Sequence, residues 1–82
     1  MNKKLEGLTF VVTGVLEEWT RLEAEEFIES CGGKMVGSVS KNTDYLVVGD
    51  KPGASKLGKA RQFGTKILNQ VELFELATAD GA

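Results

Sequence analysis

The fold of this chain is decided by the stretch Leu8-Thr9-Phe10-Val11-Val12-Thr13-Gly14. Apolar and β-branched residues follow one another here without alternation, and a Thr-Gly pair closes the run. Such a run is typical of a strand that is buried on both faces in the middle of a parallel sheet. Ligands of open α/β sheets bind beyond the carboxyl ends of the strands. The stretch therefore predicts a central strand whose Thr13 hydroxyl and Gly14 N–H lie at a ligand-binding edge.

Length and composition restrict the class of protein. The 82 residues predict one domain over 7–79, with a polar lead-in over 1–6 and a frayed tail over 80–82. The formal net charge is −2, so a contact with nucleic acid has to come from a local patch. The chain has one cysteine and no histidine, which excludes an internal disulfide and removes the commonest general base. We expect no cofactor, no metal and no membrane span or signal peptide. The expected location is intracellular, in the nucleus of a eukaryote or the cytoplasm of a bacterium.

The residues on both sides of the central stretch predict alternating strands and helices. The expected elements are a strand over 8–13, a helix that opens on a Thr20/Glu23 capping box, strands over 34–36 and 45–49, a helix over 56–63 capped by Ser55, a strand over 66–68 and a helix that opens on Asn69/Glu72. Leu57, Ala60 and Phe63 are expected to face inward. Because crossovers between parallel strands are right-handed, this order predicts an α/β fold with helices on both faces of a small sheet. The point where the strand order of this sheet reverses direction, at which open α/β sheets bind ligands, lies beyond Thr13-Gly14 and the turn over 49–55.

Charge is segregated along the chain. The glutamates gather between Glu17 and Glu29, where Arg21 is the one basic residue, and the stretch 51–66 carries no acid but five cations: Lys51, Lys56, Lys59, Arg61 and Lys66. This pattern fits two solvated helix faces of opposite sign. It also fits an anion site at the start of the second predicted helix, where backbone N–H groups and the helix dipole attract negative charge. Lys56 in that first turn opposes the dipole unless an anion is bound, and Arg21 has the same place on the first helix.

Four motifs in this order resemble a BRCT domain. They are the stretches 5–14, 32–34, 39–49 and 55–60, so the resemblance covers nearly the whole chain. The subgroup that they resemble occurs in NAD-dependent DNA ligases and in the large subunit of replication factor C, the clamp loader. The resemblance implies a four-stranded parallel sheet in the order 2-1-3-4, with the first and third helices on one face and the second on the other. The turn over 49–56 is one residue longer than in typical bacterial ligases, so both parent proteins stay open.

The resemblance also implies a phosphate pocket. In the family, a Ser or Thr that ends the first strand, the Gly after it and a Lys that opens the second helix bind a phosphate; in the clamp-loader type an Arg near the start of the first helix assists. In this sequence those positions are Thr13, Gly14, Lys56 and Arg21. The implied ligand of the clamp-loader type is the 5′-phosphate of duplex DNA, whereas tandem BRCT pairs take a phosphoserine of a partner protein.

Together, the residues and the resemblance predict a non-enzymatic module of a DNA replication or repair protein that binds 5′-phosphorylated DNA ends. Lys51, Lys59 and Arg61 would add salt-dependent contacts with the DNA backbone. Two alternatives stay open: a protein-interaction module that takes a phosphopeptide or a partner BRCT domain, and a structural domain that positions the rest of a ligase on DNA. No catalytic residue is assigned. Trp19 either packs against the first helix or stacks on a DNA end.

Overall fold

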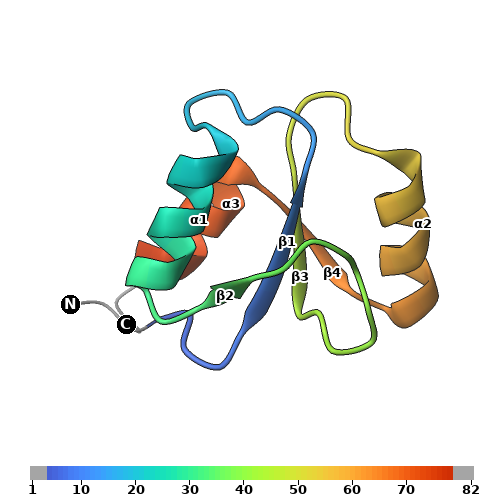
Figure 1. Cartoon of the computed structure of the whole chain (residues 1–82), viewed down its shortest axis with the longest axis horizontal. Coiled ribbons are helices and arrows are strands. Elements are labelled where there is room, and N and C mark those ends of the chain that lie inside the picture. The colour runs from blue at the N-terminus through green and yellow to red at the C-terminus, as the bar shows by residue number, and fades with distance from the viewer. Residues whose placement is uncertain (1–3, 79–82) are drawn as a thin grey trace.

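The computed structural model describes residues 4–78, arranged as a four-stranded sheet between two layers of helices (Figure 1). The tail predicted over 80–82 lies outside the described residues. The elements in chain order are β1 (Thr9–Thr13), α1 (Arg21–Ser30), β2 (Lys34–Met35), β3 (Tyr45–Val48), α2 (Ala54–Phe63), β4 (Lys66–Asn69) and α3 (Gln70–Thr78). This order confirms the one predicted from the sequence.

All neighbouring strands are parallel, and the sheet order is β2-β1-β3-β4. Val11 of β1 pairs with Leu46 of β3, and Leu46 pairs with Ile67 of β4. The helices α1 and α3 cover one face of the sheet and α2 covers the other (Figure 1). The predicted α/β class, strand order and helix placement are therefore confirmed, and the carboxyl ends of β1 and β3 lie side by side.

The core consists of two clusters, one on each face of the sheet. Phe10 and Val12 of β1 point into the larger cluster, with Ile28 of α1 and Leu73 of α3. Val11 points the other way, into a smaller cluster that includes Leu46 and Ala60, and Leu57 packs against it. Because successive side chains of a strand point to opposite faces, burial on both faces requires apolar residues at every position. This is the physical reason for the unbroken apolar run in β1.

Two of the three helices begin with the reciprocal capping bonds that the sequence predicts. In α1 the Glu23 N–H donates to Thr20 Oγ1 at 3.1 Å, and the Thr20 N–H donates to Glu23 Oε1 at 2.8 Å. The same pair of bonds joins Asn69 and Glu72 at the start of α3, at 2.7 and 3.0 Å. Both pairs satisfy backbone donors that have no acceptor inside their helix.

Three details differ from the sequence-based expectations. Leu5, placed in a polar lead-in, is fully buried, and its N–H donates to the Cys31 carbonyl at 3.0 Å. Phe63 is 42% exposed, because it lies in the last turn of α2, beyond the part of the helix that packs on the sheet. Ser55 is not the cap of α2: the helix begins at Ala54 with Gly53 as its cap residue.

The loops after β1 and β3 run against each other at the carboxyl edge. The Val15 N–H donates to the Asp50 carbonyl at 2.9 Å, and the Asp50 N–H donates back to the Val15 carbonyl at 2.8 Å. Glycine is needed on both sides of this bridge. A Cβ atom on Gly14 would lie 2.6 Å from the Asp50 carbonyl oxygen, and one on Gly49 would overlap the Val15 carbonyl.

We expect Gly49→Ala to destabilise the domain, because the clashing atoms belong to the backbone and have to move. The expected loss of unfolding free energy is about 1–3 kcal/mol, as for overpacked interior sites, and urea unfolding measures it. Gly37→Ala is the matched control, since a Cβ atom at Gly37 meets nothing within 4 Å. Equal stability of the two variants would show that the two loops tolerate being separated.

Candidate functional site

Thr13 connects the carboxyl end of β1 to the start of α2. Its side chain is 6% exposed, and Oγ1 accepts a hydrogen bond from the Gly53 N–H at 2.9 Å. This bond holds Gly53 at the cap position of α2 in an extended conformation, and it explains why Gly53 rather than Ser55 caps the helix. A threonine hydroxyl also carries one proton that it can donate, and no acceptor for it lies among residues 4–78. That proton is available to a ligand at this edge.

The N-terminus of α2 is open, whereas the starts of α1 and α3 each carry a capping side chain and an acid. It has no side-chain cap and no acid in its first turn. The N–H groups of Ala54, Ser55 and Lys56 are the orphan donors that every α-helix leaves at its start, and they carry the positive end of the helix dipole. Lys56 itself is half-buried, and its ammonium group has no hydrogen bond or ion pair with another described residue.

Gly14 supplies a further backbone donor at the same edge. Its φ of 83° is in the left-handed region, and the residue is exposed. Within the described part of the chain the Gly14 N–H has no acceptor, whereas the N–H of the next residue, Val15, is taken by Asp50. The tight approach of the two loops thus leaves the Gly14 donor facing solvent beside Thr13.

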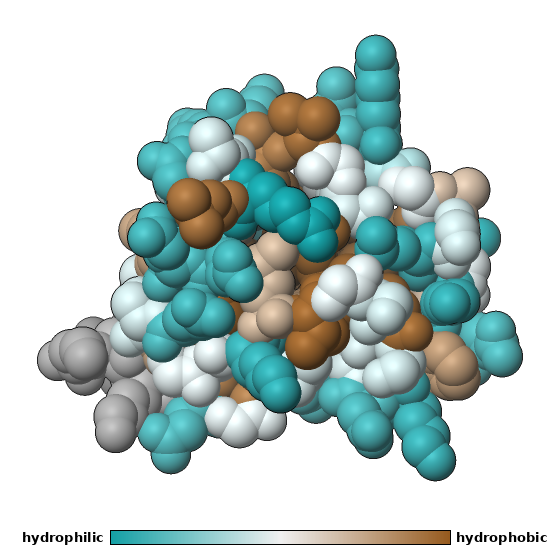
Figure 2. Space-filling view, in the orientation of Figure 1, coloured by the Kyte–Doolittle hydropathy of each residue, from teal (hydrophilic) through white to brown (hydrophobic). Residues whose placement is uncertain are grey.

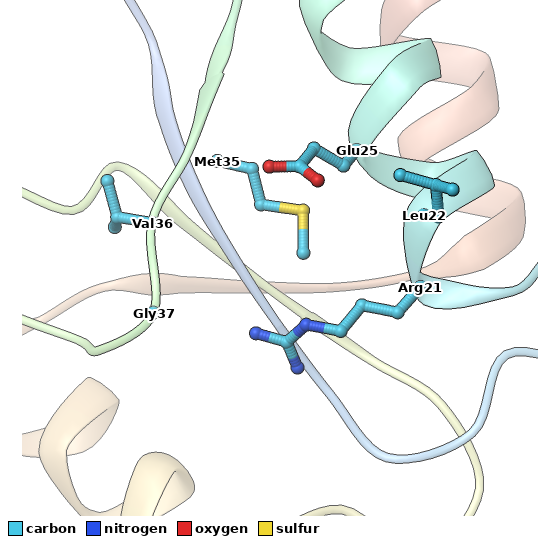
Figure 3. Close-up of a pocket in the computed structure, with 6 residues that line it drawn as sticks. All are labelled: Arg21, Leu22, Glu25, Met35, Val36 and Gly37. Carbon is cyan, nitrogen blue, oxygen red and sulfur yellow. The ribbon is translucent and has the colours of Figure 1, made fainter.

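Arg21 reaches the same edge from the opposite side of β1. It is the first residue of α1, and its Nη1 donates a long hydrogen bond of 3.4 Å to the Val12 carbonyl. The side chain also lines a groove of about 380 Å³ between α1 and β2 (Figure 3). The structure therefore brings Arg21, Thr13 and the start of α2 to one end of the sheet, although they are far apart in the sequence.

The groove beside Arg21 is a feature that the sequence analysis missed. Met35 points into it from β2, and Glu25 extends over it from α1 (Figure 3). The sequence contains a signal for the α1 wall of this groove, because residues four apart, such as Arg21 and Glu25, share one helix face. The contribution of Met35 depends on the packing of α1 against β2, which no local pattern encodes.

The remaining basic residues of the predicted site are all exposed. Lys51 lies in the turn before α2 and adopts a left-handed φ of 54°. Lys59 follows Lys56 by three residues and therefore shares its side of the helix. Arg61 lies in the last turn of α2, about 7.5 Å along the helix axis from Lys56 at 1.5 Å per residue. We call Lys51, Lys56 and Lys59, which lie in the turn before α2 and on its first turns, the basic strip. Arg61 lies at the other end of α2, away from the site.

None of the helices between residues 4 and 78 combines the length and apolar character that crossing a membrane requires. Over the same residues, no three His, Cys, Asp or Glu side chains are grouped in a way that would hold a metal ion.

Comparison with known proteins identifies relatives over most of the chain. A DNA ligase of Synechococcus sp. (strain CC9902) is 59% identical over 72 residues, which are 88% of this chain and 10% of the ligase. A DNA ligase of Fervidobacterium nodosum is 52% identical over 94% of this chain and 11% of its own length. A DNA ligase of Halorhodospira halophila is 54% identical over 95% of this chain and 11% of its own length. The chain thus spans about a tenth of the length of these relatives.

The family assignment rests on a match of almost the whole chain. The family model of the BRCA1 C Terminus (BRCT) domain matches residues 2–77. The matched region contains every strand and nearly all of α3, and the sheet order is the one that the resemblance implied. By sequence and by fold, this chain belongs to the BRCT domain family.

Proposed function

We propose that this BRCT domain binds DNA ends by holding a 5′-phosphate between the end of β1 and the start of α2. The observation that carries the proposal is the hydrogen bond from the Gly53 N–H to Thr13 Oγ1 at 2.9 Å. It joins a buried hydroxyl, whose own proton is free, to a helix start that has neither a capping side chain nor an acid in its first turn. Dianionic phosphate suits this arrangement, because it accepts several hydrogen bonds and is attracted by the helix dipole.

Each of the four predicted residues has a distinct role in this proposal. The Thr13 hydroxyl and the Gly14 N–H donate to two phosphate oxygens, and the Lys56 ammonium neutralises charge from the α2 side. Arg21 approaches from the β2 side and closes over the phosphate after leaving the Val12 carbonyl. Hydrogen bonds to charged groups contribute about 1.5–3 kcal/mol each, so the loss of one donor is measurable.

The DNA duplex would extend from the phosphate along the basic strip of Lys51, Lys56 and Lys59. Contacts of Lys51 and Lys59 with backbone phosphates release counterions, so affinity would fall as salt rises. Arg61, at the far end of α2, would reach the backbone only further along the duplex. Because the relatives are DNA ligases, we further propose that this module belongs to a ligase and positions it on DNA, without a catalytic role of its own.

The test is a binding titration at one stated salt concentration. A duplex with a recessed 5′-phosphate is compared with the same duplex carrying a 5′-hydroxyl. We expect the phosphorylated end to bind at least tenfold more tightly, which corresponds to about 1.4 kcal/mol. Equal affinities would contradict the proposal. A phosphoserine peptide and unlabelled DNA ends are then compared as competitors for the pocket. If the peptide competed and DNA ends at the same concentration did not, the result would favour a phosphopeptide ligand.

A further inference from the structure

A second hollow lies at the carboxyl edge of the sheet, on the side of α3. It consists of two adjoining depressions of about 250 and 600 Å³, which share Glu17, Gln70 and Val71. We call this surface the α3 groove. It is built from the loop after β1, the loop after β3 and the first turns of α3. None of Thr13, Gly14, Arg21 and Lys56 lines it.

The floor of the α3 groove is apolar and partly aromatic. Val15 is 70% exposed, Val71 is 64% exposed and Phe74 is 49% exposed. The ring of half-buried Trp19 lies 4.8 Å from that of Phe27 and 6.5 Å from that of Phe74. Exposed apolar residues that gather in one hollow mark interaction sites, whereas scattered ones do not.

The groove is held in shape before any partner binds. The Glu18 N–H donates to Gln70 Oε1 at 3.3 Å, which ties the loop after β1 to the first turn of α3. The Trp19 ring is fixed by its contacts with the aromatic rings of α1 and α3. A preformed groove with an immobile aromatic side chain loses little conformational entropy on binding, and buried tryptophans are frequent hot spots of interfaces.

The charged residues that line the α3 groove are all acidic. Glu17, Glu18 and Asp50 line it, and no basic residue does. Among the described residues, none of these three carboxylates forms an ion pair. A DNA backbone or a phosphopeptide would be repelled here, whereas Lys and Arg side chains of a partner would be attracted. We propose that the α3 groove binds a basic, amphipathic peptide segment of a partner protein, which places an apolar side chain against Trp19, Val71 and Phe74.

The two binding surfaces are adjacent but separate. The backbone bridge between Val15 and Asp50 stands between the Gly14 donor and the groove. Figure 2 shows an apolar spot at the top of the view, near the loop after β1. Because no lining residue is shared, DNA and a basic peptide are expected to bind at the same time. The inference therefore does not rest on the proposed DNA function.

The experiment selects ligands without assuming their sequence. A random 12-residue peptide display library is panned on the immobilised domain, and the most enriched peptide is synthesised and titrated. We expect enriched peptides to carry net positive charge and at least one large apolar residue. Trp19 is the one tryptophan of the chain, so its fluorescence is expected to change on titration and to report contact with the groove directly.

Matched variants show whether the peptide uses the α3 groove. Val71→Asp and the double change Glu17→Lys/Glu18→Lys are each expected to weaken binding at least tenfold. Leu22→Asp and Glu26→Lys/Glu29→Lys make the same changes on exposed residues outside the groove, and full affinity is expected. Lys56→Glu is expected to leave peptide affinity unchanged, which separates a failure of this inference from a failure of the DNA proposal.

Several results would overturn the inference. They are the absence of enriched peptides, enrichment of neutral or acidic peptides, an unchanged Trp19 signal, or equal loss of binding in the groove and control variants. Dimerisation of the free domain in sedimentation, abolished by Val71→Asp and not reversed by the peptide, would assign the groove to a second copy of the chain instead.

Discussion

Replacing Lys56 with glutamate is expected to abolish the preference for 5′-phosphorylated DNA ends. The substitution removes a cation from the first turn of α2 and puts a carboxylate where the phosphate would lie. The loss of one charge-assisted interaction costs about 1.5–3 kcal/mol, and repulsion adds to it, so affinity for the phosphorylated end should fall by about 10- to 100-fold or more. Binding to the 5′-hydroxyl duplex should change much less. The measurement is the same pair of titrations at fixed salt.

A loss of binding in this variant would not result from unfolding. Lys56 opposes the dipole of α2, whereas an acid in the first turn of a helix is favourable by about 0.3–1 kcal/mol. The variant should therefore be at least as stable as the parent, which urea unfolding can check. Lys66→Glu makes the same charge change at the start of β4, at the opposite end of the sheet, and should retain the preference. If both variants lost it equally, general electrostatic attraction rather than a phosphate site would explain the binding.

Phe10→Ala is expected to remove a large part of the stability of the domain. Phe10, the second residue of β1, is fully buried, and its ring stacks on Tyr45 with a centroid distance of 5.3 Å. Truncating a buried phenylalanine costs about 3–5 kcal/mol. At about 0.05–0.15 kcal/mol per residue, the whole chain has only about 4–12 kcal/mol available. We expect a large fall in the urea midpoint, or a domain that is partly unfolded in buffer.

Phe63→Ala is the matched control for this loss. It deletes the same ring from a site that is 42% exposed in the last turn of α2. Because little apolar area leaves the core and alanine favours helix, the expected cost is below about 1 kcal/mol. A comparable loss in both variants would mean that the end of α2 packs far more tightly than its exposure indicates.

The fold was largely predictable because its signals are local. The unbroken apolar run of β1 indicates burial on both faces, and the capping pairs Thr20/Glu23 and Asn69/Glu72 mark two helix starts within four residues each. The errors arise where local signals are overridden by distant contacts or are too weak to read. Ser55 is a good cap residue, but the Thr13 hydroxyl, forty positions away, binds the Gly53 N–H and moves the start of α2. The burial of Leu5 has no sequence signal, because one apolar residue among polar neighbours carries no periodicity.

The residues of the candidate site were proposed from the sequence, whereas their arrangement at one edge was not. Thr13, Gly14, Lys56 and Arg21 follow from the end of a strand, from two helix starts and from the resemblance to the family. Their approach to one edge depends on the parallel pairing of β1 with β3 and on the Val15–Asp50 bridge, which bring together residues far apart in the chain. The α3 groove had no sequence signal, since Trp19 and Phe74 meet only after α1 and α3 pack on the same face of the sheet.

The sequence by itself determined the fold class, the order of the elements and the segregation of positive and negative charge between helices. These properties depend on periodicity, on caps and on neighbours within a few residues. The tertiary structure alone decided that the start of α2 has no capping side chain, and it decided which apolar residues of the helices remain exposed. It also decided that acidic and basic surfaces meet at one edge of the sheet. These properties depend on contacts between distant segments, and such contacts arise only when the strands pair and the helices pack against them.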